Sequence, residues 1–237
     1  MDLLTADARS FPADLPPADN AQAITRTDWQ AFAALTRMKD HWDRPGWEDP
    51  HRRVYYWMLT FDGHTDLLDL TRRCQHPLEP LGLDLIPATS LHVTMLRIGD
   101  RHLVDLPVLR DLADTVEGLG VRAFTVHAHP IAGSRGAIRY SLSPWTPLVR
   151  LHAALTRAGR HHGVPGGADT ASFRPHLGIA YNPTERDAKP VIEAASHLRQ
   201  LPPMALTVPA IDLVELRREG RRYRWDTVRT IPLVTAP

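Results

Sequence analysis

Apolar and polar positions alternate around two histidines of this chain, in residues 91–95 (Leu-His-Val-Thr-Met) and 175–179 (Pro-His-Leu-Gly-Ile). Successive side chains of a β-strand point to opposite faces, so His92 and Thr94 share one face and their apolar neighbours share the other. His176 is set into its segment in the same way. Each segment is therefore predicted to be a strand that presents one imidazole on a face not needed for the core.

The same pattern predicts strands and helices along most of the chain. Long apolar, β-branched or alternating runs predict strands over 53–61, 91–98, 122–129, 137–142, 204–217 and 222–233, besides the strand that carries His176. Helical spacing predicts helices over 27–38, 65–75, 106–117, 145–162 and 184–198, the first capped by Thr27 or Asp28. We expect an α+β fold with two pseudo-symmetric lobes, each a mainly antiparallel sheet flanked by helices. The two histidines would meet in the cleft between the lobes.

Composition limits the classes of protein that the chain can belong to. With 237 residues, 43% of them hydrophobic, it can bury a sizeable core, and a net charge of +1 excludes a strongly basic nucleic-acid binder. We expect a Pro- and Asp-rich loose arm followed by a helix over residues 1–50, and one bilobal domain over 51–237. The single cysteine, Cys74, and the lack of a long apolar run predict a cytoplasmic protein, not a membrane protein, and we expect a monomer.

Two imidazoles that face each other suit acid-base chemistry near neutral pH. One can take a proton from water while the other returns a proton to a leaving oxygen. The Thr94 hydroxyl, on the same face as His92, can donate a hydrogen bond to a phosphoryl oxygen where charge develops. This chemistry is phosphodiester cleavage without a metal, with His92, His176 and Thr94 as the catalytic residues.

The arrangement resembles the 2H phosphoesterase superfamily, which includes RNA 2′,5′-ligase and cyclic phosphodiesterase proteins and is defined by two His-x-Thr/Ser motifs. His92-Val93-Thr94 matches the first motif, whereas the second matches only at His176, because Gly178 replaces Thr or Ser. The resemblance implies a 2′,3′-cyclic phosphate or a related nucleotide or RNA phosphodiester as substrate. A nucleotide or RNA terminus is then the expected partner, with no cofactor and no metal.

The glycine in the second motif predicts an altered phosphate contact. Loss of one oxyanion donor costs about 10- to 1000-fold in rate but removes neither proton carrier. Gly178 and Ala180 would leave the cleft face of their strand almost bare, which suits a bulkier substrate. Arg174 is predicted to share this face and to anchor a phosphate in place of the missing hydroxyl. Tyr181 is a candidate for stacking on a base, which completes the predicted substrate-binding set.

Other features allow competing interpretations. His127 and His129 on one strand face are either a metal pair or ordinary solvent-facing histidines, and no ligand pattern accompanies them. The basic and aromatic segment 217–225 is either an RNA contact or a solvated hairpin tip. Three functions stay open: a phosphodiesterase, a nucleotide- or RNA-binding module with impaired catalysis, and a 2′,5′ RNA ligase that runs the same chemistry in reverse.

Overall fold

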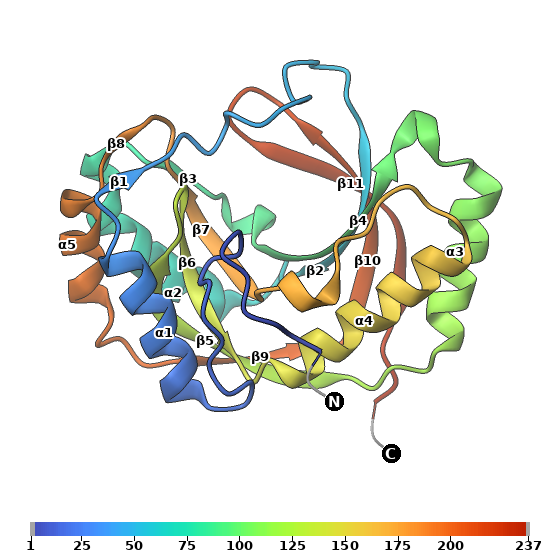
Figure 1. Cartoon of the computed structure of the whole chain (residues 1–237), viewed down its shortest axis with the longest axis horizontal. Helices are drawn as coiled ribbons and strands as arrows, with labels where there is room; N and C mark the ends of the chain where they lie inside the picture. Colours follow the sequence, from blue (N-terminus) through green and yellow to red (C-terminus); the bar gives the residue numbers. More distant parts are fainter. Residues whose placement is uncertain (1–2, 236–237) are drawn as a thin grey trace.

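Two antiparallel sheets form the centre of the computed structural model, which describes residues 3–235 (Figure 1). The four-stranded sheet has the order β11 (Tyr223–Pro232), β10 (Ala210–Arg218), β2 (Val54–Thr60), β4 (His92–Asp100). The five-stranded sheet has the order β3 (Asp84–Leu85), β7 (His176–Tyr181), β6 (Ala137–Ser143), β5 (Phe124–Gly133), β9 (Met204–Val208). A short ladder joins β1 (Arg37–Met38) to β8 (Arg186–Asp187).

Within residues 3–235, five α-helices cover the sheets, and two of them contact the sheet that they do not follow in the chain. The helices are α1 (Ala21–Ala33), α2 (Thr65–Gln75), α3 (Leu106–Gly118), α4 (Thr146–His161) and α5 (Lys189–Leu198). Four short 3-10 helices cover His76–Leu81, Ala88–Ser90, Arg101–Leu103 and Thr170–Ser172. Helix α2 follows β2 in the chain but contacts β7 in the other sheet, and α4 follows β6 but contacts β4. This exchange packs the two lobes into one hydrophobic cluster and holds β4 beside β7.

The architecture confirms the predicted α+β class and the two mainly antiparallel sheets. Each histidine strand has the predicted alternation at its start: His92 and Thr94 are partly exposed, while Leu91, Val93 and Met95 are buried. In residues 3–235 no helix is both long enough and apolar enough to cross a membrane.

Three predicted boundaries are wrong for identifiable reasons. Helix α1 begins at Ala21, because the Asn20 side chain caps it by accepting a hydrogen bond from the backbone N–H of Ala23 at 2.9 Å. The predicted strand 204–217 is two strands in different sheets, interrupted at Pro209, which has no N–H for a ladder. The predicted helix 184–198 begins only at Lys189, because residues before it pair in β8.

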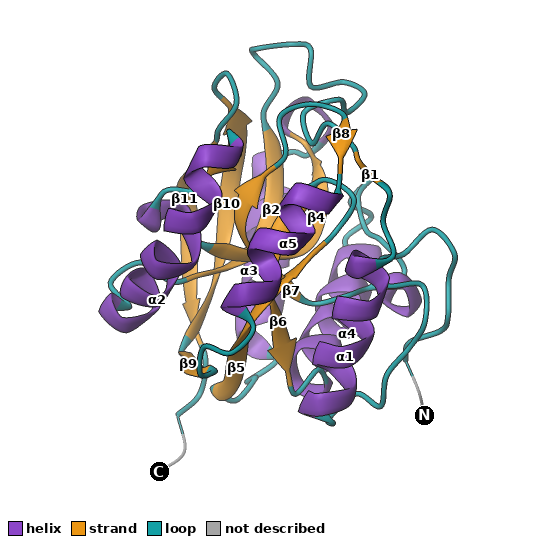
Figure 2. Ribbon diagram, turned by 90° about the vertical axis from the view of Figure 1, so that its left-hand side faces the viewer, coloured by secondary structure: helices purple, strands orange, loops and turns teal. Residues whose placement is uncertain are grey.

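The N-terminal segment is docked on the fold, which corrects the expectation of a loose arm. Residues 3–20 form neither helix nor strand, but Thr5 donates a backbone hydrogen bond to Ala171 and Trp145 donates one to Ala18. After β1, the chain crosses the top of the molecule before it enters β2 (Figure 1). Residues 39–47 of this crossing are called the strap below. A side view shows the strap region at the end of the molecule opposite both termini (Figure 2).

Candidate active site

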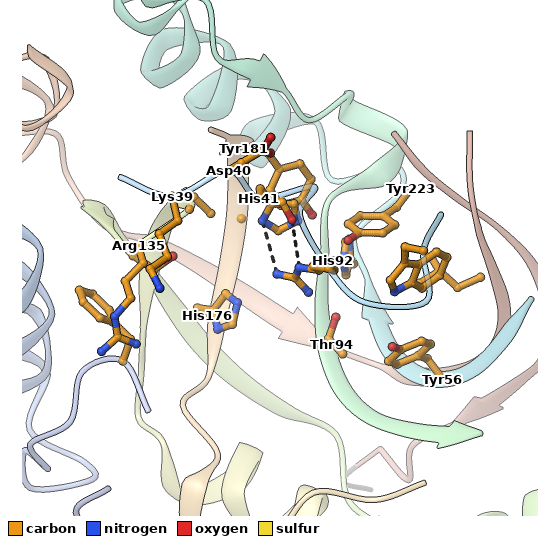
Figure 3. Close-up of a pocket in the computed structure, with 18 of the residues that line it drawn as sticks. Lys39, Asp40, His41, Tyr56, His92, Thr94, Arg135, His176, Tyr181 and Tyr223 are labelled. Carbon is orange, nitrogen blue, oxygen red and sulfur yellow. Dashed lines mark hydrogen bonds between the residues drawn. The ribbon is translucent and has the colours of Figure 1, made fainter. Parts of the chain in front are cut away.

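One cavity collects both predicted histidines, Thr94, Gly178 and Tyr181. Its volume of about 480 Å³ is in the range usual for small-molecule sites. Figure 3 shows His92 and His176 on neighbouring strands, with the cavity between and above them. The other lining residues come from the N-terminal segment, from β2, from the β5–β6 turn and from the last hairpin: Phe11, Lys39, Asp40, His41, Arg44, Trp47, Tyr56, Met58, Ser134, Arg135, Gly136, Ala137, Leu216 and Tyr223.

Each of the two histidines is held by a hydrogen bond from its ring to a nearby backbone carbonyl oxygen. His92 Nδ1 lies 2.8 Å from the Ser90 carbonyl oxygen, and His176 Nδ1 lies 2.9 Å from the Arg174 carbonyl oxygen. A carbonyl oxygen only accepts, so each Nδ1 carries the hydrogen and donates it to the residue two positions earlier. The neutral imidazole then has its lone pair on Nε2. Each ring therefore offers an Nε2 that can take a proton, or give one once protonated.

Each histidine strand also has a β-bulge three residues after its histidine. The pairing of β4 with β2 shifts register so that Met95 is passed over, and the pairing of β7 with β6 shifts so that Ile179 is passed over. Such a bulge turns the strand and changes which side chains face the same way beyond it. Only the first three positions of each strand, from the histidine to Thr94 or Gly178, therefore keep the predicted alternation toward the cavity.

The enclosure of the cleft lowers the pKa of both histidines. For His92 the main cause is desolvation, which outweighs the opposing effect of the hydrogen bond to Ser90. Desolvation also comes first in lowering the pKa of His176, followed by the positive charge of the buried Arg139. Both rings are thus neutral at pH 7 in the ligand-free cleft. An anionic phosphoryl group between them would favour the protonated form of either ring.

The two motif positions differ in what they offer a phosphoryl oxygen. Thr94 is half-buried, lines the cavity, and has no hydrogen-bond partner for its hydroxyl in the described chain. Gly178 lines the cavity from the other strand with no donor side chain. A Cβ at position 178 would lie 3.2 Å from Ile86 Cδ1 and 4.0 Å from Tyr181 Cε1. The backbone here does not require glycine, since its φ is not in the left-handed region.

Tyr181, and not Ala180, continues the cavity wall beyond the bulge. The alternation predicted Ala180 on the cleft face, but this residue is fully buried because Ile179 shifts the register. The Tyr181 ring instead lines the cavity and stacks on His41, with 3.8 Å between ring centroids and an interplanar angle of 22°. Tyr223 packs edge-on against Tyr181 at 5.7 Å, so one side of the cavity is an aromatic wall.

Arg174 does not line the cavity, which contradicts the prediction that it shares the face of His176 and anchors phosphate. Its guanidinium is buried and donates hydrogen bonds to backbone carbonyl oxygens of the N-terminal arm and of its own segment: Thr5, Pro12, Ala13, Ala171 and Phe173. Residue 174 precedes β7, where strand alternation no longer fixes its direction. These hydrogen bonds attach the N-terminal segment, residues 3–20, to the segment that precedes β7.

The strap supplies site residues that the strand pattern could not indicate. Lys39, Asp40, His41, Arg44 and Trp47 all line the cavity but lie in a loop without a repeating pattern. Within the strap, Arg44 Nε donates to the His41 carbonyl oxygen at 3.1 Å. Composition is the one sequence feature that could have indicated a site here, because residues 39–47 combine three cationic or imidazole side chains with two tryptophans.

Two residues of the competing features, His129 and Arg217, have side-chain partners within the protein. His129 Nε2 lies 2.8 Å from Ser143 Oγ, and no group of three or more potential metal-ligand side chains occurs within residues 3–235. In the 217–225 hairpin, Arg217 pairs with Glu219 and Asp226, while Tyr223 faces the cavity. Trp225 packs edge-on against His92 at 5.2 Å, so this hairpin forms part of the cavity wall.

Comparison with known proteins gives one family match. The family model described as the 2′-5′ RNA ligase superfamily matches residues 59–220. LigT of E. coli has a similar structure, with a TM-score of 0.57 and 16% identity over 77% of this chain and 98% of LigT. TT0787 of Thermus thermophilus gives a TM-score of 0.57 and 16% identity over 76% of this chain and 97% of that protein. A comparison with curated protein sequences gives no match.

Proposed function

The chain belongs to the 2′-5′ RNA ligase superfamily, and we propose that it is a metal-independent phosphodiesterase acting on a 2′,3′-cyclic phosphate or a related nucleotide or RNA phosphodiester. The family match confirms the resemblance to the 2H phosphoesterases, a group that generally consists of phosphodiesterases. The structural similarity to LigT confirms the LigT-like fold. The substrate and the roles of His92 and His176 are the proposed part.

One observation carries the proposal: two imidazoles of the same tautomer line one cavity of about 480 Å³. Buried polar groups that serve only the fold are mostly hydrogen-bonded within the protein. Here each Nδ1 is bound to backbone and each Nε2 has no protein partner within residues 3–235. Neutral rings that can gain a proton when an anion enters are suited to general acid-base catalysis at near-neutral pH.

The proposed reaction needs only these two rings and one donor. The Nε2 of one histidine takes a proton from water, and the water oxygen attacks phosphorus. The other histidine, as an imidazolium, gives its Nε2 proton to the ribose oxygen as the bond from that oxygen to phosphorus breaks. A phosphomonoester and a free hydroxyl result, and Thr94 donates a hydrogen bond to a non-bridging oxygen.

Nucleotides fit the surroundings of the two histidines. Lys39, Arg44 and Arg135 provide positive charge in the cavity lining, and Tyr56 and Tyr223 provide aromatic faces. Structures of E. coli LigT have been determined with 3′-AMP and with ATP. The combination supports a nucleotide or an RNA terminus as the substrate.

The direct test is turnover by the full chain in excess chelator. The substrates are 2′,3′-cyclic nucleotides, RNA ending in a cyclic phosphate, and 2′,5′-linked oligonucleotides. We expect hydrolysis of at least one of them, unchanged by the chelator. Activity that disappears with chelator and returns with added divalent metal would contradict the metal-independent mechanism.

Gly178 favours a second candidate, a binding module of the same fold with weakened catalysis. This alternative predicts nucleotide binding without turnover of any substrate in the panel. Strand joining by the same site would use a free 5′-hydroxyl in place of water: one histidine takes its proton, the 5′ oxygen attacks the cyclic phosphate, and the ribose 3′ oxygen leaves with a proton from the other histidine. A 2′,5′ ligation assay with a cyclic-phosphate end and a free 5′-hydroxyl end measures it. A ligation product formed faster than hydrolysis product would make ligation the main activity.

A further inference from the structure

We propose that the strap and the β5–β6 turn form a second anion subsite, centred on Lys39 and Arg135, that holds a second phosphoryl group of the same nucleotide. This inference deepens the proposed function, on which it rests for the identity of the ligand as a nucleotide. It assigns a role to a part of the chain that precedes the family match at residues 59–220.

The two cationic residues are brought together by backbone hydrogen bonds. The Lys39 N–H donates to the Arg135 carbonyl oxygen at 2.6 Å, which joins the strap to the β5–β6 turn. Asn182, after β7, ties both to the histidine strand: its N–H donates to Gly136 at 2.9 Å, and its side-chain amide donates to Lys39 at 2.8 Å. The His41 N–H completes the set by donating to Asn182 at 2.8 Å. The subsite backbone is therefore fixed relative to His176.

The charges of this region are not neutralised within the protein. Neither Lys39 nor Arg135 has a carboxylate within 4.0 Å in residues 3–235, whereas Arg217 and Arg229 each contact two. Arg135 is half-buried, and its Cζ lies 5.3 Å from the centroid of the Phe11 ring, a contact that leaves the positive charge of the guanidinium in place.

The other titratable groups facing this region leave a net positive charge. Asp40 is the one carboxylate among the described lining residues, and its Oδ1 accepts the Trp42 N–H at 2.7 Å. His41 is neutral, because desolvation and the nearby Arg44 lower its pKa to about 2. His176 is neutral for the reasons given above. Lys39 and Arg135 carry two positive charges against the single negative charge of Asp40, so the region favours an anionic ligand group.

The position of the cations separates this subsite from the reacting phosphoryl group. In Figure 3, Lys39 and Arg135 lie beyond His176 on the side away from His92, and Thr94 and Tyr56 lie on the other side. A phosphoryl group between the two histidines therefore leaves the cationic pair free for another one. Arginine binds phosphate through two parallel N–H donors, and lysine adds a mobile point charge. A terminal phosphate is the group that both recognise.

A binding comparison tests the subsite without depending on turnover. Adenosine 2′-monophosphate and adenosine 2′,5′-bisphosphate are titrated calorimetrically into the wild-type chain, into K39A/R135A and into the control R157A/K189A. The control removes the same two charge types from exposed helix positions outside the cavity. We expect the wild type and the control to bind the bisphosphate about 10- to 100-fold more tightly than the monophosphate. K39A/R135A should lose this preference, because its affinity for the bisphosphate falls by a larger factor than its affinity for the monophosphate.

Equal affinities of the wild type for the two nucleotides, or a preference that survives in K39A/R135A, would overturn the inference. A preference lost equally in the control would assign the effect to net charge and would overturn it too. Failure of the proposed function is a separate result: no cyclic phosphate would be hydrolysed, while the binding comparison would still give its own answer.

Discussion

Restoring a hydroxyl at position 178 probes the asymmetry between the two motifs. In the Gly178→Ser variant, the new Cβ lies 3.2 Å from Ile86 Cδ1, the flexible end of a side chain. A shift of a few tenths of an ångström relieves this contact, so we expect a loss of less than about 1 kcal/mol in the free energy of unfolding, below the usual cost of overpacking a core. Positions 178 and 94 line the same cavity, so the serine hydroxyl adds a second donor for the phosphoryl group.

The expected gain follows from the value of one oxyanion donor. We expect kcat for a 2′,3′-cyclic nucleotide to rise by about 10-fold or more, with little change in KM, because the contact strengthens in the transition state. Gly178→Ala is the matched control, since it adds the same Cβ without the hydroxyl. The assay is steady-state hydrolysis of 2′,3′-cyclic AMP, with urea unfolding of each variant as the stability check.

Two results would refute this reasoning. If serine and alanine change kcat by the same factor, the hydroxyl does not reach the phosphoryl group. If both lower kcat while the variants stay folded, the bare strand at Gly178 is itself part of the substrate surface. That second outcome would also support a substrate bulkier than a mononucleotide.

Further expected outcomes concern pH, the donor and the arm. The base must be neutral and the acid protonated. Desolvation lowers the pKa of His92 below 6.5 and that of His176 to about 3, so kcat/KM measured from about pH 2.5 to 8 should be bell-shaped with its maximum below pH 6.5. A maximum above pH 7 would contradict this assignment. Thr94→Ala should lower kcat by about 10- to 100-fold, less than loss of either histidine, and an unchanged kcat would exclude its donor role. Arg174→Ala should lower the free energy of unfolding in urea by about 2 to 4 kcal/mol, since it leaves buried carbonyl oxygens unpaired. If the Arg174→Ala variant is as stable as the wild type but binds nucleotide more weakly, Arg174 has a substrate-binding role and not a structural one.

The sequence was most informative where a local rule decides the structure. The alternation of strand side chains placed His92, Thr94, His176 and Gly178 on one cavity, because each lies within three residues of a regular strand start. Beyond that point the bulge at Ile179 changed the facing side chains, so Tyr181 lines the cavity where Ala180 was expected. A bulge depends on the partner strand and has no signature in this segment alone.

Long-range docking accounts for most of what the sequence could not predict. The position of Arg174 two residues before His176 predicted that it binds phosphate. Its guanidinium instead donates hydrogen bonds to carbonyl oxygens of the N-terminal segment, more than 150 residues earlier in the chain. Likewise, Asp28 was a candidate helix cap but is buried within α1, where it pairs with Arg139. The strap residues reach the cavity through a loop, for which neither strand nor helix periodicity exists.

The central claim is that His92 and His176 together carry the proton transfers. It is tested most directly by the single-turnover rate of His92→Ala, His176→Ala and the double variant on the best substrate of the panel, each shown by its unfolding curve to be folded. General acid-base groups contribute about 100- to 10,000-fold, so each single variant should lose at least 100-fold. The double variant should lose little more than the worse single one, because the rings act as a pair. Normal turnover by either single variant would contradict the two-histidine mechanism.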